Sequence, residues 1–258
     1  MTSEPISRVE RQQNILTYLS RQKRISVAEI CDMFSVSEAT ARRDLEELTE
    51  QNHLQRVQGG AISLRQAPPE LPILQRESEQ SQEKKRIGLA AASLVQDGDT
   101  VILGSGSTTL EVARNMQDRN NLTVITNSLP VMNLFSGLPH IDLIALGGIL
   151  RDSELSFIGH ITEQALEEIY ADKVILGVHA LDIEKGLTND FLPEAMTDRA
   201  IIKSGSQVIL VVDHSKINTV SVAYLAPIKS IHKLVTDQKT DEDFINKIIE
   251  LGIEVILA

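Results

Sequence analysis

The stretch of sequence that decides the fold of the N-terminal part runs from residue 26 to residue 45 and reads SVAEICDMFSVSEATARRDL. Ser26 and Glu29 have the spacing of a capping box, which predicts a helix over Val27–Phe34. After a three-residue turn, Ser37 can cap a further helix over about Glu38–Glu50. Two short helices joined by such a turn form a helix-turn-helix.

The segments on either side complete this motif. Apolar residues at helical spacing predict a first helix over about Arg8–Ser20, followed by a polar connection over Arg21–Ile25. On the other side, residues 53–62 read HLQRVQGGAI, which predicts two short strands around Gly59-Gly60. A helix-turn-helix followed by a hairpin of this kind is winged. We therefore predict a winged helix-turn-helix domain over residues 1–65.

This domain is expected to bind DNA. Side chains near the start of the recognition helix enter the major groove, and Arg42 and Arg43 can each hold a guanine or a phosphate through two parallel hydrogen bonds. A lone Arg-Arg pair would more often be a solvated helix face, but inside a winged helix-turn-helix DNA contact is the better interpretation. The predicted DNA-binding residues are Ser37, Glu38, Thr40, Arg42, Arg43, Arg56, Gly59 and Gly60.

Charge and composition are compatible with this interpretation. The 258-residue chain has a net charge of −11, yet residues 1–65 hold nine Lys/Arg and nine Asp/Glu, whereas residues 66–258 hold 16 and 27. The acidity therefore lies outside the predicted DNA-binding part. No apolar run is long enough for a membrane span, and the polar N-terminus is not expected to be a secretion signal. A single cysteine, Cys31, fits a reducing cytoplasm, which is the expected location.

The rest of the chain is predicted to be an α/β domain. Residues 66–76 contain Pro68-Pro69 and are expected to form a stiff linker, and residues 77–258 a second domain. After a polar helix near residues 78–94, apolar strands alternate with amphipathic helices, which predicts a mostly parallel, helix-covered sheet. The expected strands are Thr100–Leu103, Thr123–Thr126, Asp142–Leu146, Lys173–Val178, Gln207–Val212, Lys233–Thr236 and Glu254–Leu257.

A glycine-rich segment follows the first of these strands. Residues 104–109 read GSGSTT, and glycines before a helix let the backbone curl around an anion, although a plain tight turn would use them too. The segment lacks the lysine of a P-loop and the third glycine of the dinucleotide motif. Further polar motifs stand at expected strand ends, at residues 126–128, 147–148 and 213–216. Because open α/β sheets bind ligands at this edge, one shared pocket is the better hypothesis.

Three spaced blocks resemble the DeoR family of bacterial repressors, namely residues 11–19, residues 36–45 and residues 56–61. The resemblance extends over nearly the whole chain. It implies a C-terminal sensor domain similar to ribose-5-phosphate isomerase and to the coenzyme A transferase fold. The chain departs from the family pattern at a few positions. In the first domain, the family usually has Ile where Ala41 stands and often His where Gln58 stands. In the second, it often has Asp where Gly104 stands and usually Lys or Arg where Asp198 stands, and His179-Ala180 replaces a small, glycine-containing pair.

The resemblance also implies a function. The chain is expected to be a repressor of a sugar-utilisation operon that leaves its double-stranded operator when a phosphorylated sugar binds, and to act as a homo-dimer or tetramer without enzymatic activity. The implied effector-binding residues are Gly104, Ser105, Gly106, Ser107, Thr108, Thr109, Asn127, Gly148, Asp182, Glu194, Asp213 and Lys216. No cofactor or membrane partner is expected. No metal site is expected either, because the histidines at 140, 160, 179 and 214 lack metal-ligand spacing.

Two alternatives remain open. Asp182, Glu194 and Lys216 are the residue types that a phosphosugar isomerase needs, so an enzyme tethered to DNA is one. The other is a ligand-independent DNA-binding protein whose C-terminal half serves only oligomerisation. Turnover by isolated residues 75–258 would identify the first, and operator affinity that no ligand changes would favour the second.

Overall fold

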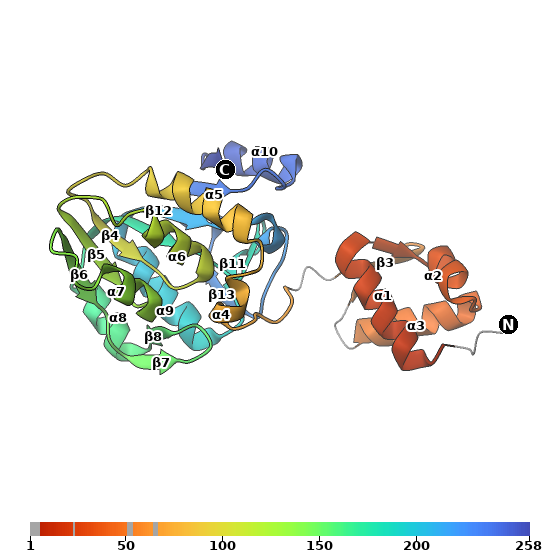
Figure 1. The fold of residues 1–258 in the computed structure, drawn as a ribbon. Helices are drawn as coiled ribbons and strands as arrows, with labels where there is room; N and C mark the ends of the chain where they lie inside the picture. The colour runs from red at the N-terminus through yellow and green to blue at the C-terminus, as the bar shows by residue number, and fades with distance from the viewer. Residues whose placement is uncertain (1–5, 23, 51–53, 64–66) are drawn as a thin grey trace. The chain divides into compact units, whose positions relative to one another are not determined.

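A computed structural model of the protein describes residues 6–22, 24–50, 54–63 and 67–258 (Figure 1). The chain divides into two compact units, Met1–Gln66 and Ala67–Ala258. Within the described ranges, no helix has both the length and the apolar character needed to cross a membrane.

The first unit is a winged helix-turn-helix, as predicted. Its helices are α1 (Arg8–Gln22), α2 (Val27–Phe34) and α3 (Glu38–Glu50), and its strands are β1 (Arg24–Ser26), β2 (Leu54–Val57) and β3 (Gly60–Ser63). The three strands form an antiparallel sheet in the order β1-β3-β2. The bounds of α2 and α3 are those predicted, because the expected serine caps are formed.

Local hydrogen bonds show why these elements begin where they do. The Oγ of Ser26 accepts the amide hydrogen of Glu29 at 3.1 Å, while the Glu29 carboxylate accepts from the Ser26 amide at 2.7 Å. At α3, the Oγ of Ser37 accepts from the Thr40 amide at 3.3 Å. These bonds satisfy amides that the first turn of a helix leaves without a backbone partner.

Strand β1 was not expected from the sequence, which predicts a polar connection there. Of its three residues only Ile25 is buried, so the apolar signal of a strand is missing. Its pairing with β3 explains one of the two wing glycines. A Cβ at Gly60 would lie 2.1 Å from the carbonyl oxygen of Ile25, so no other residue fits where these strands meet.

The second unit is built on a parallel sheet of seven strands, and the expected strands are confirmed within two residues of their bounds. The strands are β4 (Thr100–Leu103), β5 (Leu122–Thr126), β6 (Ile141–Ala145), β9 (Ala171–Leu176), β12 (Gly205–Val211), β14 (Lys233–Thr236) and β15 (Glu254–Leu257). Their order is β15-β14-β12-β9-β4-β5-β6, and every neighbouring pair is parallel.

Helices cover both faces of this sheet (Figure 1). The helices are α5 (Ser81–Ala92), α6 (Ser107–Arg114), α7 (Leu129–Phe135), α8 (His160–Glu167), α9 (Leu192–Lys203) and α10 (Glu242–Glu250). In β4, Val101 and Leu103 pack in the same cluster as buried residues of α5, α6 and α7, whereas Ile102 packs with those of α8, α9 and α10. This alternation makes three layers, with an apolar core on each side of the sheet.

Smaller elements complete the second unit. They are the short helix α4 (Ile73–Arg76), the hairpin of β7 (Ile149–Arg151) and β8 (Ser156–Ile158), the antiparallel sheet of β10 (Ala180–Asp182), β11 (Gly186–Asn189) and β13 (Ala223–Ala226), and the 3-10 turns η1 (His214–Lys216) and η2 (Ile228–Ser230).

Residues 67–76 differ from the expected linker, because they belong to the second unit. The amide of Ala67 donates to the carbonyl of Val220, and the amide of Ile73 to that of Ser153, both at 2.8 Å. Ile73 is fully buried at the start of α4. The prolines that suggested a linker only keep the backbone extended before that helix. We call residues 67–72 the strap.

Candidate functional site

The predicted DNA-contacting arginines lie exposed on helix α3 of the first unit. Arg42 and Arg43 are both exposed, and the guanidinium of Arg42 is 3.3 Å from the carboxylate of Glu38, one turn earlier. Two acidic residues of the same helix turn the other way, where Asp44 pairs with Arg11 of α1 and Glu47 with Arg8. Part of the negative charge of α3 is therefore neutralised away from the arginines.

The other predicted DNA-binding residues play different structural parts. Ser37 and Thr40 bond to each other at the start of α3, with 3.0 Å between their hydroxyl oxygens. Gly59 forms the exposed turn of the wing at a φ of +82°, and Arg56 of β2 is half-buried. Gly60 is buried, and its backbone pairs with both neighbouring strands of the sheet.

A polar cavity lies in the second unit at the carboxyl ends of β4, β9 and β12. After β4 the chain passes to β5 and β6 on one side, and it returns as β9 on the other. This is the point in an open α/β sheet where ligands bind. The cavity is lined by the predicted residues Ser105, Gly106, Ser107, Thr108, Thr109, Glu194, Asp213 and Lys216.

The glycine-rich segment forms one wall of the cavity at the beginning of α6. Gly106 adopts a φ of +125°, which favours glycine. Among the described residues, the amides of Ser107, Thr108 and Thr109 donate no hydrogen bond, and Leu110 is the first to bond back, to Gly106. Three amides at the positive end of a helix are thus left for an acceptor in the cavity.

Another wall of the cavity carries basic side chains, and most of them were not predicted. Lys84 of α5 is 5% exposed, and its ammonium donates to the carbonyl of Arg76 at 2.6 Å. Within the described part of the chain, no carboxylate lies within 4.0 Å of that ammonium, and burial lowers its pKa. Arg76, His179 and Lys216 line the same space. A buried cation without an acidic partner is a place where an anionic ligand is favoured.

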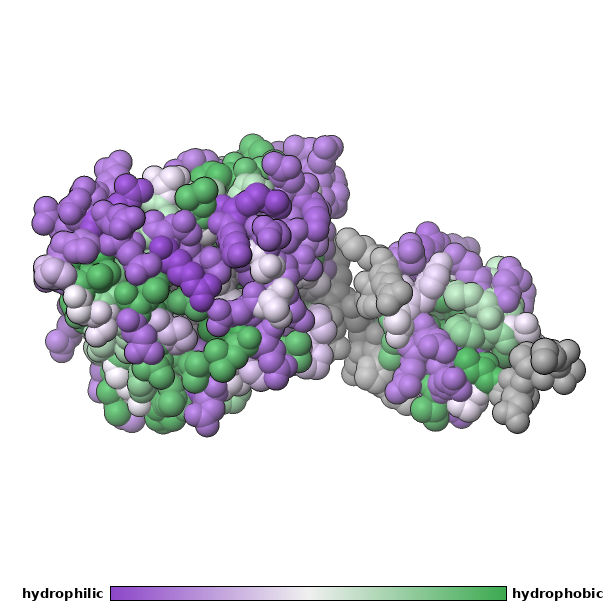
Figure 2. Space-filling view, viewed as in Figure 1, coloured by the Kyte–Doolittle hydropathy of each residue, from purple (hydrophilic) through white to green (hydrophobic). Residues whose placement is uncertain are grey.

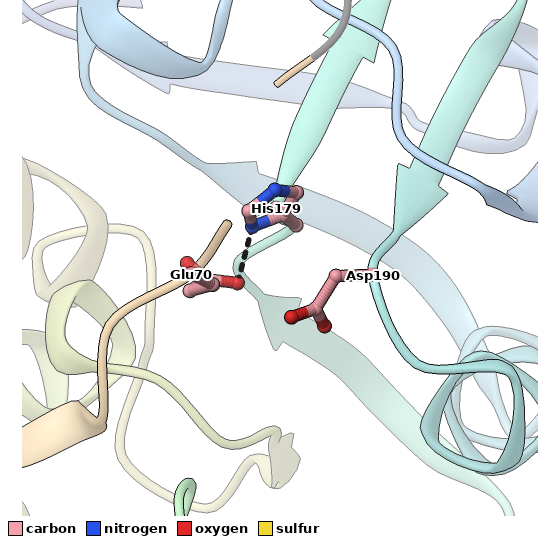
Figure 3. Close-up of side chains that lie close together, drawn as sticks. All are labelled: Glu70, His179 and Asp190. Atoms are coloured by element: carbon pink, nitrogen blue, oxygen red, sulfur yellow. Dashed lines mark hydrogen bonds and ion pairs between the residues drawn. The ribbon is translucent and has the colours of Figure 1, made fainter. Parts of the chain in front are cut away.

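Glu70 of the strap extends into this cationic wall. One of its oxygens is 2.5 Å from Arg76 and 2.8 Å from Lys216, and the other is 2.6 Å from Nδ1 of His179. The ligand atoms of Glu70, His179 and Asp190 lie within 4.8 Å of one another (Figure 3). This cluster has metal-binding residue types, but Arg76 and Lys216 already neutralise Glu70. Two adjacent cations would repel a metal ion there.

The floor of the cavity carries two buried carboxylates one turn apart on α9. Glu194 forms an ion pair with Arg151, and the carboxylate of Asp198 accepts a hydrogen bond from the side-chain amide of Asn189 at 2.8 Å. Burial raises the pKa of Glu194, and the nearby Asp198 raises it further. Burial also raises the pKa of Asp198, to about 7, although the charge of Arg151 opposes this.

This raised pKa predicts a pH-dependent cost in stability. A carboxyl with a pKa near 7 in the folded state and near 3.9 in the unfolded state contributes most to the free energy of unfolding below pH 4. That contribution is lost as the pH rises through 7. Asp198→Asn removes the charge and keeps an oxygen for Asn189. The difference in melting temperature between this variant and the wild type should grow in the variant's favour by about 5 °C from pH 5 to pH 8. This corresponds to a change in the free energy of unfolding on the order of 2 kcal/mol.

Melting curves at the two pH values measure this difference. The matched control is Asp142→Asn, because Asp142 is exposed on β6. The control should show the same pH dependence as the wild type. An advantage of Asp198→Asn that stays constant from pH 5 to pH 8 would contradict the raised pKa.

Four predicted effector-binding residues do not line the cavity. Asn127 is fully buried, and its amide bonds the carbonyl of Phe157; Asp182 caps the turn after β10 by accepting from the amides of Glu184 and Lys185. Two glycines allow close packing, Gly104 against Leu176 and Gly148 against Thr162. These residues shape the segments around the cavity, and their part in effector binding stays a prediction.

Sequence reasoning missed several lining residues for a common reason. Glu70 and Arg76 stand in what looks like a linker, and Lys84 in a helix whose many charges suggest a solvated face. The side chains of Glu70 and Lys216 meet across 146 positions. The sequence does carry one signal that residues 66–76 are not a linker throughout. Residues 73–76 contain no proline and favour a helix, and apolar Ile73 precedes Arg76 there.

Comparisons with known proteins agree with both units. Residues 11–67 match the family described as DeoR-like helix-turn-helix domain, and residues 79–238 match the DeoR C terminal sensor domain. The chain is 35% identical over 232 residues to the transcriptional repressor AccR of Agrobacterium fabrum, covering 90% of each chain. It is 33% identical over 232 residues to the glycerol-3-phosphate regulon repressor of Escherichia coli, covering 90% of this chain and 92% of that one.

Among solved structures, ribose 5-phosphate isomerase A from Methanocaldococcus jannaschii is similar at 19% identity and a TM-score of 0.41, over 54% of this chain and 55% of that one. Both family matches fall where the structure has a separate unit, and relatives at 33–35% identity extend across nine-tenths of the chain. The chain therefore belongs to the DeoR family of transcriptional regulators.

Proposed function

We propose that the protein is a DNA-binding repressor that leaves its operator when a phosphorylated sugar binds in the cavity of the second unit. The observation that carries this proposal is the cavity itself, where the unpaired amides of Ser107, Thr108 and Thr109 face the buried ammonium of Lys84. A phosphate offers several acceptor oxygens to those amides and negative charge to that ammonium.

The floor of the cavity suits the sugar part of such a ligand. Glu194, Asp198 and Asp213 line it, and carboxylates accept hydrogen bonds from hydroxyl groups. The glycerol-3-phosphate regulon repressor among the relatives supports a small phosphorylated effector. The alternative of an isomerase has no comparable support from the curated relatives, which are named as regulators.

Self-association is part of the proposal, because a dimer places two recognition helices on a symmetric operator. Figure 2 shows hydrophilic side chains over most of the visible face of the second unit and apolar ones gathered along its lower edge. Strand β7 and helix α8, which lie at that edge in Figure 1, carry the exposed residues Ile149, Leu150 and Ile161. Such exposed apolar side chains favour contact with a second copy.

The ligand part of the proposal is tested by thermal shift with a panel of sugar phosphates, each paired with its unphosphorylated sugar. At least one phosphosugar should raise the melting temperature of the second unit, and its unphosphorylated partner should not. Lys216→Met should reduce the shift, because it removes a cation from the cavity wall. A panel in which sugars and their phosphates act alike would contradict the proposal.

A further inference from the structure

The solvent exposure of the side chains in the strap is the reverse of what their residue types predict. Leu71 is 44% exposed and Pro68 and Pro69 are exposed, whereas the charged side chain of Glu70 is only 8% exposed. An apolar residue normally faces inward and a glutamate outward. The inverted orientation indicates that Glu70 is held by the cations of the cavity and that packing of the strap contributes little.

The contacts of Glu70 are those that a bound anion would make. Two cationic groups, Arg76 and Lys216, and the Nδ1 of His179 converge on its two oxygens from separate segments. Burial alone would raise the pKa of Glu70, but the hydrogen bond from His179 and the charges of Lys216 and Arg76 outweigh it and hold that pKa well below its usual range. The carboxylate is therefore ionised and neutralises this part of the wall.

Glu70 also lines two neighbouring spaces. The cavity beside the glycine-rich segment has a volume of about 70 Å³, and an outer hollow of about 440 Å³ is lined by further strap residues as well. Glu70, Arg76, His179 and Lys216 line both spaces. Ligand pockets are typically roughly 300–1,000 Å³, so the inner cavity alone is too small for a phosphosugar. Moving Glu70 aside would join the two.

We propose that the Glu70 carboxylate occupies an anion subsite formed by Arg76, His179 and Lys216, and that the effector binds by displacing Glu70 and the strap. This inference rests on the proposed function, because it names how the same cavity accepts its ligand. The cations exchange one set of charge-assisted hydrogen bonds for another, so displacement leaves no buried charge unpaired.

Displacement has a direct consequence for the first unit. The strap begins at Ala67, where the first unit ends. Apart from the backbone bond of Ala67 and the two that the carbonyl of Pro72 accepts from Gln75 and Arg76, the Glu70 contacts are the hydrogen bonds and ion pairs that hold the strap within the described residues. Freeing these six residues adds up to about 20 Å to the tether between the units. In an oligomer, a longer tether lowers the effective concentration of the second recognition helix at the operator, which weakens binding.

The test measures binding of inorganic phosphate to the full-length chain, at constant ionic strength, by thermal shift or calorimetry. Glu70→Gln removes the competing charge and should bind phosphate at least tenfold more tightly than the wild type. The matched control is Glu79→Gln, which removes the same charge from an exposed residue at the rim of the same cavity. The control should change phosphate affinity less than threefold.

A second measurement uses the wild type and does not depend on the variant folding. Hydrogen exchange of the peptide over residues 67–76 should become faster when phosphate is added, because the amide of Ala67 loses its acceptor as the strap leaves. Equal phosphate affinity of wild type and Glu70→Gln, or slower exchange in the strap, would overturn the displacement while leaving the proposed function in place. If neither protein binds phosphate, the anion subsite falls, and the phosphosugar panel then decides the proposed function separately.

Discussion

The double variant Arg42→Ala, Arg43→Ala is expected to bind operator DNA at least about a hundredfold more weakly than the wild type. Both side chains are exposed on α3, and a bidentate contact to a base or phosphate contributes about 1–3 kcal/mol. Because neither guanidinium is part of the buried core, the melting temperature should stay within a few degrees of the wild type. Fluorescence anisotropy on a duplex selected by the wild type from a random pool measures the affinity.

The matched control is Lys85→Ala with Arg86→Ala. These two basic residues are also adjacent and exposed on a helix, but on α5 of the second unit. The control removes the same two charges, so it corrects for the general electrostatic attraction between protein and DNA. Equal loss of affinity in both double variants would contradict the assignment of α3 as the recognition helix.

Arg11→Ala is expected to have the largest effect on stability. The guanidinium of Arg11 lies 2.5 Å and 3.0 Å from the two oxygens of Asp44, and both side chains are almost completely buried. Removing the arginine leaves a buried carboxylate without its partner, which costs about 3–5 kcal/mol. A unit of this size has little stability to spare, so it should unfold well below the melting temperature of the second unit.

Calorimetry separates the two transitions, and Arg8→Ala is the matched control. Arg8 lies one turn earlier on α1 and pairs with Glu47, but its side chain is 60% exposed. Exposed pairs contribute about 0–1 kcal/mol, so this variant should melt nearly as the wild type does. A similar small effect of both variants would show that the Arg11–Asp44 pair does not hold α1 against α3.

The helix-turn-helix could be predicted almost to the residue, because its signals are local. The capping box of Ser26 and Glu29 and the cap at Ser37 lie within one turn of the helices that they start. Ala41 stands where the family usually has isoleucine, and it is fully buried in the core of the first unit. Strand β1 was missed because a strand with one buried residue has no periodicity to detect.

The seven parallel strands were predictable for a related reason. Strands covered on both faces need apolar side chains at nearly every position, as β4 and β12 show. The short strands β10 and β11 have no such run, and they were missed together with β13.

The candidate site was only half predictable. The segment from Ser105 to Thr109 can be recognised from the sequence, because glycines stand there between a strand and a helix. The contacts of Glu70 with His179 and Lys216 join residues 109 and 146 positions apart, and no local pattern carries that information. Asn127 and Asp182 lie outside the cavity lining, because polar residues at strand ends also serve as buried hydrogen-bond partners and turn caps.

The central claim is that a phosphosugar bound in the second unit lowers the affinity of the first unit for DNA. The most direct measurement is the affinity of the full-length protein for its selected duplex, with and without a phosphosugar identified by thermal shift. Coupling between two sites is typically 1–3 kcal/mol, so saturating phosphosugar should weaken DNA binding by about tenfold or more, and the unphosphorylated sugar should not. Unchanged DNA affinity while the phosphosugar is demonstrably bound would contradict the account.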